Sequence, residues 1–349
     1  MIRTTRARRA LIATMAAVAA VALPLSAAAG AQAASPDAGL YGSSDPTYDG
    51  VYRQSLAMLG LAEAGAKVPA AAVDWLAGQQ CLDGSYLAYR KSIRTACPQP
   101  DAANFTGPDS NSTALAAMAL AATGRKAAAD KAAKALVASQ NADGGWGYTL
   151  GGASDANSTG LVLAALDKSS NDEAAAERRG IAYLTSLAGS CTAGASSLPF
   201  QAGQAANDLA SAQALLGLNT GLPMAPSHAK YTKEHSCTEA LDQRVAEYLL
   251  DDLKKGKGLL HSPMDPSKTD FNTTAWAVLA LVGANRPAAE LAQPVRQLMK
   301  NARTFVGKGA AASPAAAGTL ALLAMATDGD VRDFGGLNLV DAINATLRK

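Results

Sequence analysis

Three stretches of the chain open with the same polar pattern and continue as long apolar runs. The pattern Asp-x-Asn-Ser/Thr-Thr begins at Asp109, Asp155 and Asp270, and each copy is followed by Ala, Leu, Val and Gly with scarcely a charge. A helix that is apolar on every side must be buried on every side. We therefore predict buried inner helices at these three places.

Between the apolar runs lie segments with a single apolar stripe. In 126–140, Ala129, Ala133 and Leu136 recur at helical spacing, while Lys and Asp fill the other positions. The segment 238–255 has the same character, which predicts a helix that covers another helix and faces water. Pairing buried with amphipathic segments predicts six hairpins, at 51–80, 110–140, 155–188, 207–253, 270–306 and 313–348.

A helical hairpin repeated along the chain forms either an open solenoid or a closed ring. Burial of the first helix of each pair favours closure, because an open solenoid would wet one side of it. No sustained alternation of β-branched residues predicts a sheet. The predicted fold is all-α, an α6/α6 toroid of six helical hairpins that forms a single domain over residues 34–349.

The first 33 residues have the pattern of a secretory signal peptide. Arg3, Arg6, Arg8 and Arg9 precede an apolar run, and small residues lead to a cleavage site before Ala34. Cleavage there changes the formal net charge from +2 to −2. A nearly neutral chain disfavours nucleic acid as a partner. We predict a secreted protein, extracellular or associated with the cell surface.

Four cysteines in an exported chain predict two disulfides, and three pairings are open. Pairing Cys81 with Cys97 and Cys191 with Cys237 is favoured, because each pair then lies within one stretch between helices. A zinc site is disfavoured, since the cysteines lack histidines at a metal-ligand spacing. No metal is expected.

A second motif follows two of the predicted outer helices. The segments 80–86 and 140–146 share Gln-x-x-Asp-Gly-x-aromatic. Glycine after a helix adopts the left-handed conformation that ends it, so the motif predicts a structural corner. The second copy, QNADGGWGY at 140–148, resembles the glutamine-tryptophan repeat of squalene cyclases and related prenyltransferases. This resemblance implies the same α6/α6 toroid as the helix count.

The superfamily includes terpene cyclases, protein prenyltransferase β-subunits and the helical domain of extracellular cobalamin carriers. Class II cyclases use an acidic Asp-x-Asp-Asp run, whereas this chain offers only Asp251-Asp252, predicted on an outward face, and Asp328-Gly-Asp330 in a turn. The zinc ligands of protein prenyltransferases are missing from the inner-helix starts as well. These absences argue against catalysis.

The cobalamin carriers are similar in compartment and in the polar residues at their inner-helix starts. The resemblance implies a monomeric secreted protein that binds a small molecule at the toroid mouth, with a cobalamin-like corrinoid as ligand and no other cofactor. Those carriers add a C-terminal β-domain over the ligand, so a membrane transporter or capping protein is expected instead. The alternatives are a terpene cyclase or prenyltransferase-like enzyme and a carbohydrate-active toroid enzyme, which would pair Asp109 with Asp155 or Asp208.

Hairpins that alternate in direction bring all inner-helix N-termini to one mouth, where unpaired N–H groups gather. Helix capping explains the Asp residues of the motif at least in part. Trp276 is expected to fill the core. The candidate ligand-binding residues are Tyr48, Asp49, Asp109, Asn111, Thr113, Tyr148, Asp155, Asn157, Thr159, Asn207, Asp208, Asp270, Asn272 and Thr274.

Overall fold

Six helices whose sequences are apolar on nearly every side form the inner layer of the molecule. The computed structural model describes residues 37–166, 174–219, 221–223 and 236–349, and the predicted signal peptide lies outside these residues. The inner helices are α1 (Gly50–Glu63), α3 (Ser110–Ala122), α5 (Ala156–Leu166), α7 (Asp208–Leu218), α9 (Phe271–Gly283) and α11 (Pro314–Ala326).

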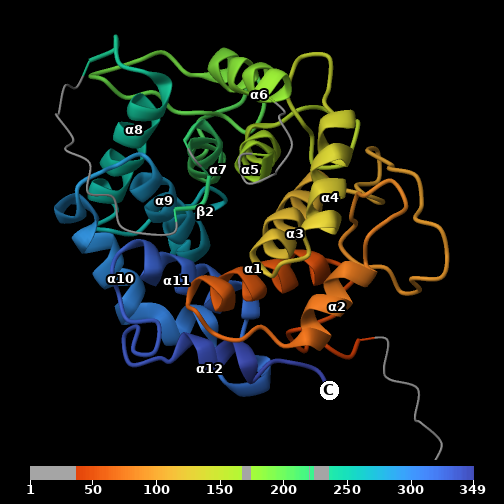
Figure 1. Cartoon of the computed structure of the whole chain (residues 1–349). Coiled ribbons are helices and arrows are strands. Elements are labelled where there is room, and N and C mark those ends of the chain that lie inside the picture. The colour runs from red at the N-terminus through yellow and green to blue at the C-terminus, as the bar shows by residue number, and fades with distance from the viewer. Residues whose placement is uncertain (1–36, 167–173, 220, 224–235) are drawn as a thin grey trace, which may run out of the picture. The chain divides into compact units, whose positions relative to one another are not determined.

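A second helix follows each inner helix and covers it from outside (Figure 1). These outer helices carry one apolar stripe, as α8 does with Val245, Leu249 and Leu253 buried. They are α2 (Ala70–Gly78), α4 (Lys126–Ala138), α6 (Ala174–Leu187), α8 (Leu241–Lys255), α10 (Ala288–Val306) and α12 (Leu339–Asn344).

The inner helices form a closed ring. Each contacts the next in chain order, from α1 through α3, α5, α7 and α9 to α11, and α11 packs against α1. Within the described residues, all of α5 is buried, and the other inner helices are buried over most of their length. The prediction of an all-α toroid of six hairpins is confirmed.

Glycines allow the closest approaches within this ring. A Cβ on Gly160 of α5 would lie 2.2 Å from the backbone oxygen of Gln213 on α7, and a Cβ on Gly318 of α11 would lie 2.2 Å from the oxygen of Leu56 on α1. Neither separation is sterically possible for a methyl group. These two glycines therefore set how tightly α5 packs on α7 and α11 on α1.

The two predicted corners have the same hydrogen bonds. Gln80 Nε2 donates to the carbonyl oxygens of Gly84 at 3.0 Å and Ala128 at 2.9 Å. Gln140 Nε2 donates to those of Gly144 at 2.7 Å and Ala176 at 2.8 Å. Each glutamine thus ties the end of one outer helix to the next outer helix, which explains why the motif recurs at identical spacing.

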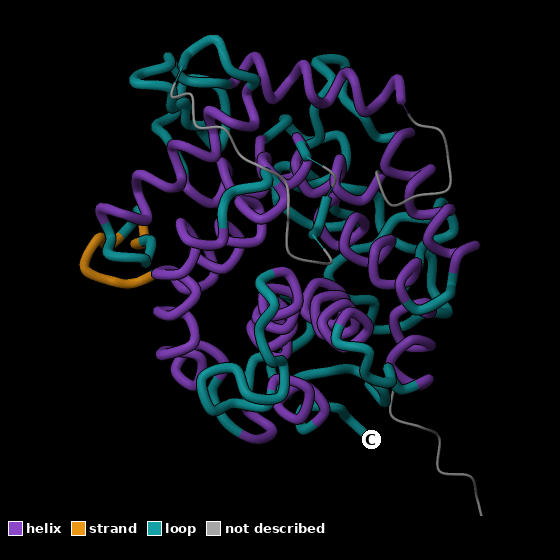
Figure 2. Tube along the Cα trace, turned by 60° about the vertical axis from the view of Figure 1, so that its left-hand side comes forward, coloured by secondary structure: helices purple, strands orange, loops and turns teal. Residues whose placement is uncertain are grey.

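The segment between α8 and α9 departs from the prediction. It contains a short antiparallel hairpin, β1 (His261–Ser262) and β2 (Asp265–Thr269), where no sheet was expected (Figure 2). Its strands are mostly exposed and too short to show an alternating pattern. The hairpin carries His261 toward the start of α9.

Both favoured disulfides are present, between Cys81 and Cys97 and between Cys191 and Cys237. The first joins the loop before α3 to the end of α2, and the second joins the loop before α7 to the start of the α8 region. None of the helices described has both the length and the apolar character to cross a membrane.

Candidate functional site

The acidic residues of the repeated motif cap the inner helices. Asp109 Oδ1 accepts the backbone N–H of Ser112 at 2.7 Å, and Asp155 Oδ1 accepts that of Ser158 at 2.7 Å. Asp270 Oδ1 accepts the N–H of Thr273 at 2.8 Å in the same way. Each carboxylate satisfies N–H groups that the first turn of a helix leaves unpaired.

The threonines of the motif hold the incoming loops. Thr113, Thr159 and Thr274 accept, through Oγ1, the backbone N–H groups of Tyr86 at 2.9 Å, Trp146 at 3.0 Å and Leu260 at 2.9 Å. All three threonines are fully buried. They line none of the cavities described below and make structural hydrogen bonds, although the sequence had placed them among the ligand-binding candidates.

Four of the candidate residues meet in one pocket of about 440 Å³, here called the mouth pocket. It lies where the starts of α7 and α9 meet the outer helix α8 and strand β1. Its lining residues are Asn157, Phe200, Ala206, Asn207, Asp208, Leu209, Tyr248, Asp252, His261, Pro263, Asp270 and Thr273. Pockets of this size commonly hold small molecules.

Asp208 is the carboxyl group that the mouth pocket perturbs. Tyr248 Oη donates a hydrogen bond of 2.6 Å to Asp208 Oδ1. Burial raises the pKa of the Asp208 carboxyl, the hydrogen bond from Tyr248 lowers it, and the nearby Asp252 and Asp270 raise it further. The net result is a raised pKa. Asp208 therefore retains its proton to a higher pH than an ordinary aspartate.

Asp252 had been predicted on an outward face of its helix, and the structure corrects this. Tyr248 and Asp252 are four residues apart, so they share one face of α8, at the edge of its buried stripe. That edge overlies the start of α7 rather than open water. Lys255 Nζ donates to Asp252 Oδ1 at 2.6 Å from the exposed side.

Sequence reasoning missed Phe200, Tyr248, Asp252 and His261 as lining residues. The spacing of Tyr248 and Asp252 was a usable signal, because two polar-tipped residues border the apolar stripe at i and i+4. Phe200 and His261 lie in a loop and in the short hairpin, and no local pattern there indicates which way a side chain points.

A second, smaller pocket of about 280 Å³ lies beside the first and shares Phe200 with it. Tyr148 and Asp155 line it, so the structure separates these two candidates from Asp208. Burial raises the pKa of Asp155 to about 6, against the hydrogen bonds from Ser158 that lower it. Burial likewise raises the pKa of Asp109 to about 7. Asp109 lines neither pocket.

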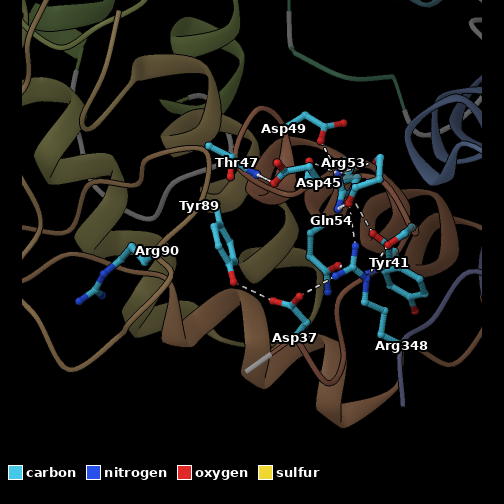
Figure 3. Close-up of polar contacts among 12 residues, drawn as sticks. Asp37, Tyr41, Asp45, Thr47, Asp49, Arg53, Gln54, Tyr89, Arg90 and Arg348 are labelled. Atoms are coloured by element: carbon cyan, nitrogen blue, oxygen red, sulfur yellow. Dashed lines mark hydrogen bonds and ion pairs between the residues drawn. The ribbon is translucent and has the colours of Figure 1, made fainter. Parts of the chain in front are cut away.

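The first repeat contributes a structural network rather than a cavity. Tyr48 is 81% exposed, and Asp49 forms an ion pair with the buried Arg53. Figure 3 shows Arg53 surrounded by the loop before α1, with Arg348 from the chain end nearby. Asn272 is exposed, Asn111 lines neither pocket, and Trp276 fills the core as predicted.

No group of acidic, histidine or cysteine side chains within the described part of the chain has the arrangement of a metal site. The mouth pocket combines acidic, amide, hydroxyl and aromatic side chains. Its uncommon features are a carboxyl group with a raised pKa, a tyrosine that donates to it and two further carboxyl groups nearby.

No family model matches the sequence, and no curated protein matches it. Among solved structures, a protein from Actinoplanes is 18% identical with a TM-score of 0.49, over 84% of this chain and 79% of that one. A variant of the type II terpene cyclase MstE from Scytonema, in complex with geranylgeranyl dihydroxybenzoate, is 13% identical with a TM-score of 0.47, over 84% and 88%. ent-Copalyl diphosphate synthase from Streptomyces platensis is 16% identical with a TM-score of 0.35, over 69% and 50%.

These comparisons contradict the prediction of a secreted cobalamin-type carrier. The similar structures with a named activity are terpene cyclases, and some of them hold a small-molecule substrate or product. The 440 Å³ mouth pocket is also at the low end of the range for organic ligands, which suits a molecule smaller than a corrinoid. The likeness of these structures to this chain concerns its fold.

Proposed function

We propose that this chain is an enzyme that binds an isoprenoid in the mouth pocket and starts its reaction by protonation from Asp208. The observation that carries the proposal is the Asp208 carboxyl itself. It lines a pocket, it accepts a hydrogen bond from Tyr248, and its pKa is raised by burial and by the neighbouring acids. A general acid must hold its proton near neutral pH until the substrate arrives.

The rest of the lining suits a hydrocarbon chain that becomes positively charged. Phe200, Leu209 and Pro263 give the pocket apolar wall, which an isoprenoid would cover. When Asp208 transfers its proton to an alkene, the alkene π electrons form the new C–H bond and the adjacent carbon becomes a cation. Loss of a proton from a carbon next to the cation, to the Asp208 carboxylate or to water, then forms the new alkene and ends the reaction. Carboxylates at Asp252 and Asp270 would stabilise that charge in the transition state.

The pocket wall also contains two aromatic rings. Phe200 and Tyr248 both line the pocket, and the face of an aromatic ring attracts a cation. Tyr248 has a second role, because its hydrogen bond orients the Asp208 carboxyl. The reaction class is therefore acid-initiated isomerisation or cyclisation of an isoprenoid alkene.

Deuterium incorporation tests this proposal. The purified chain is incubated with geranylgeraniol or farnesol in D₂O, and the extract is analysed by gas chromatography and mass spectrometry. We expect an isomeric or cyclised product that carries one added deuterium. Asp208→Asn should lower the rate by about 10²–10⁴-fold, whereas Asp251→Asn, on the exposed side of α8, should leave it unchanged. Unreacted substrate with the intact protein would contradict the proposal.

Glycoside hydrolysis is a second candidate, because Asp208 and Asp252 place two carboxyl groups in one pocket. The pairs that the sequence had suggested, Asp109 with Asp155 or Asp208, are not brought together. Chromogenic aryl glycosides distinguish the two reactions. Turnover that is lost in Asp208→Asn would favour hydrolysis over isoprenoid chemistry.

We also propose that the enzyme works outside the cytoplasm. Two disulfides support this, since such bonds persist mainly in oxidising compartments. The basic and apolar character of residues 1–33 supports it as well. Mass spectrometry of protein recovered from the culture medium should give a chain that begins at or near Ala34. Recovery of the full-length chain from cytosol only would contradict export.

A further inference from the structure

The charged side chains that line the mouth pocket are of one sign. Asp208, Asp252 and Asp270 all line it, and the described lining includes neither lysine nor arginine. Lys255 reaches Asp252 only from the exposed side of α8 and does not line the cavity. An anionic ligand entering this pocket would meet three acidic side chains, and His261 is the one basic side chain of the described lining.

The hydroxyl groups of the pocket also favour a ligand that donates hydrogen bonds. Tyr248 already donates its hydroxyl proton to Asp208, and Thr273 Oγ1 donates to Asp270 Oδ2 at 2.7 Å. The hydroxyl donors at the wall are therefore engaged within the protein. Apart from the His261 ring and the side-chain amides of Asn157 and Asn207, the polar groups that the wall offers a ligand are hydrogen-bond acceptors.

Asn157 provides an independent indication of this. It lines the pocket at 9% exposure, and its Nδ2 donates to Gln213 Oε1 at 3.1 Å. Its Oδ1 has no hydrogen-bond partner among the described residues. The oxygen is itself covered, so it places an unsatisfied acceptor directly behind the pocket wall.

We infer that the mouth pocket selects isoprenoids whose head group is uncharged and donates a hydrogen bond, such as an alcohol or phenol, and that it excludes prenyl diphosphates. The inference rests on the proposed function and names its substrate class. Asp252 and Asp270 are the residues that determine this selectivity. Their charges also predict that an ammonium head group, which is cationic and a donor, binds best.

Three probes with one hydrocarbon chain test the inference. Farnesol, farnesylamine and farnesyl diphosphate are each titrated into the full-length chain by calorimetry at pH 7 and low salt. We expect farnesylamine to bind at least about tenfold more tightly than farnesol, and farnesyl diphosphate at least about tenfold more weakly. Diphosphate binding as tight as alcohol binding would overturn the inference.

Charge-removing variants identify the cause. The double change Asp252→Asn and Asp270→Asn should reduce the preference for amine over diphosphate by at least about tenfold, and asparagine at 270 keeps a good helix cap. Asp251→Asn is the control for the change at Asp252, because it removes one charge from the same helix outside the pocket. An equal reduction in the control would show that net charge alone, not the pocket, sets the preference, and would overturn the assignment.

The outcomes separate this inference from the proposed function. If the diphosphate binds and is converted to a deuterated product, the head-group inference fails while the protonation reaction stands. If none of the three probes binds, the isoprenoid proposal itself fails and the inference fails with it.

Discussion

At the scale of single residues, the polar positions of the repeated motif divide into two kinds. Asp109 and Thr113 are buried and serve the backbone, whereas Asn157 and Asp270 line a cavity. A helical repeat places equivalent side chains at equivalent positions, but the mouth pocket is lined from the repeats of α5, α7 and α9 and not from those of α1, α3 and α11. Equivalence in sequence therefore does not imply equivalence in function.

The buried cap Asp109 should make stability depend on pH. Its pKa is raised, chiefly by burial, to about 7, so folding favours its protonated form. That contribution to stability is complete below about pH 4 and is lost as the pH rises through about 7. Asp109→Asn keeps the cap without the charge and should gain on the order of 1 to 3 kcal/mol relative to the intact protein between pH 4.5 and 8.

Urea unfolding at several pH values measures this difference. The exposed change Asp251→Asn provides the control and should run parallel to the intact protein. A constant gap between Asp109→Asn and the intact protein across this range would show that the carboxyl does not titrate there.

The hydroxyl group of Thr159 should contribute to the stability of the folded chain. Its Oγ1 accepts the N–H of Trp146, and valine would fill the same space but leave that buried N–H without a partner. Thr159→Val should therefore lower the free energy of unfolding by about 1–3 kcal/mol. Thr123→Val at the end of α3 is the comparison, because Thr123 only donates to a helix carbonyl that already has its place in the helix. Equal losses in the two variants would refute this role.

At the scale of helices and strands, apolar character predicts elements well and side-chain direction poorly. The apolar runs predicted all six inner helices, because a helix that is apolar on every side is stable only when it is buried. The direction of Asp252 was predicted wrongly, since an amphipathic stripe has borders that only the neighbouring helices define. The hairpin at 261–269 was missed because its strands are too short for alternation.

Replacing glycine by alanine should have opposite effects on stability at two helix positions, because only one of them lies against another helix. Gly160→Ala would drive a methyl group into the backbone of α7, 2.2 Å from the oxygen of Gln213, and should cost about 1–3 kcal/mol or more. Gly78→Ala lies in α2, where the nearest atom is a side-chain methyl of Ile93 at 3.8 Å. This second variant should gain about 0.5–1 kcal/mol, because alanine favours the helix.

Thermal and urea unfolding of the two variants, side by side, measure these effects. If both variants lost stability, the loss in Gly160→Ala could not be assigned to the close approach of α5 and α7. Unchanged stability in Gly160→Ala would show that α5 and α7 lie farther apart than the structure has them.

At the scale of the whole ring, the sequence predicts closure but not the joint that makes it. The chain end returns to the first repeat, where the N–H of Gly39 donates to the carbonyl oxygen of Arg348 at 2.9 Å and that of Arg348 donates to Leu40 at 2.9 Å. These segments are separated by nearly the whole chain, so no local pattern links them. The sequence predicted four residues of the pocket but not the residues they meet, because its walls come from α5, α7, α8, α9 and β1 together.

Arg348 bridges this joint with its side chain, and its removal should weaken the ring chiefly at the joint. The guanidinium donates to Asp37 Oδ2 at 2.6 Å, to the oxygen of Gly42 at 2.7 Å and to that of Ser44 at 2.7 Å (Figure 3). Arg348→Met keeps an unbranched side chain at this position and removes these three hydrogen bonds. Because the group is largely but not fully buried, we expect a loss of about 1–2 kcal/mol in the free energy of unfolding.

Hydrogen exchange shows whether that loss belongs to the joint. In Arg348→Met the amides of α1, α11 and α12 should exchange faster, and those of α5 and α7, on the far side of the ring, should change less. Lys349→Met, next along the chain, is the matched control and should leave exchange and stability unchanged. Uniform acceleration in every helix would indicate that the ring opens only by complete unfolding, so that the joint is no weaker than the rest.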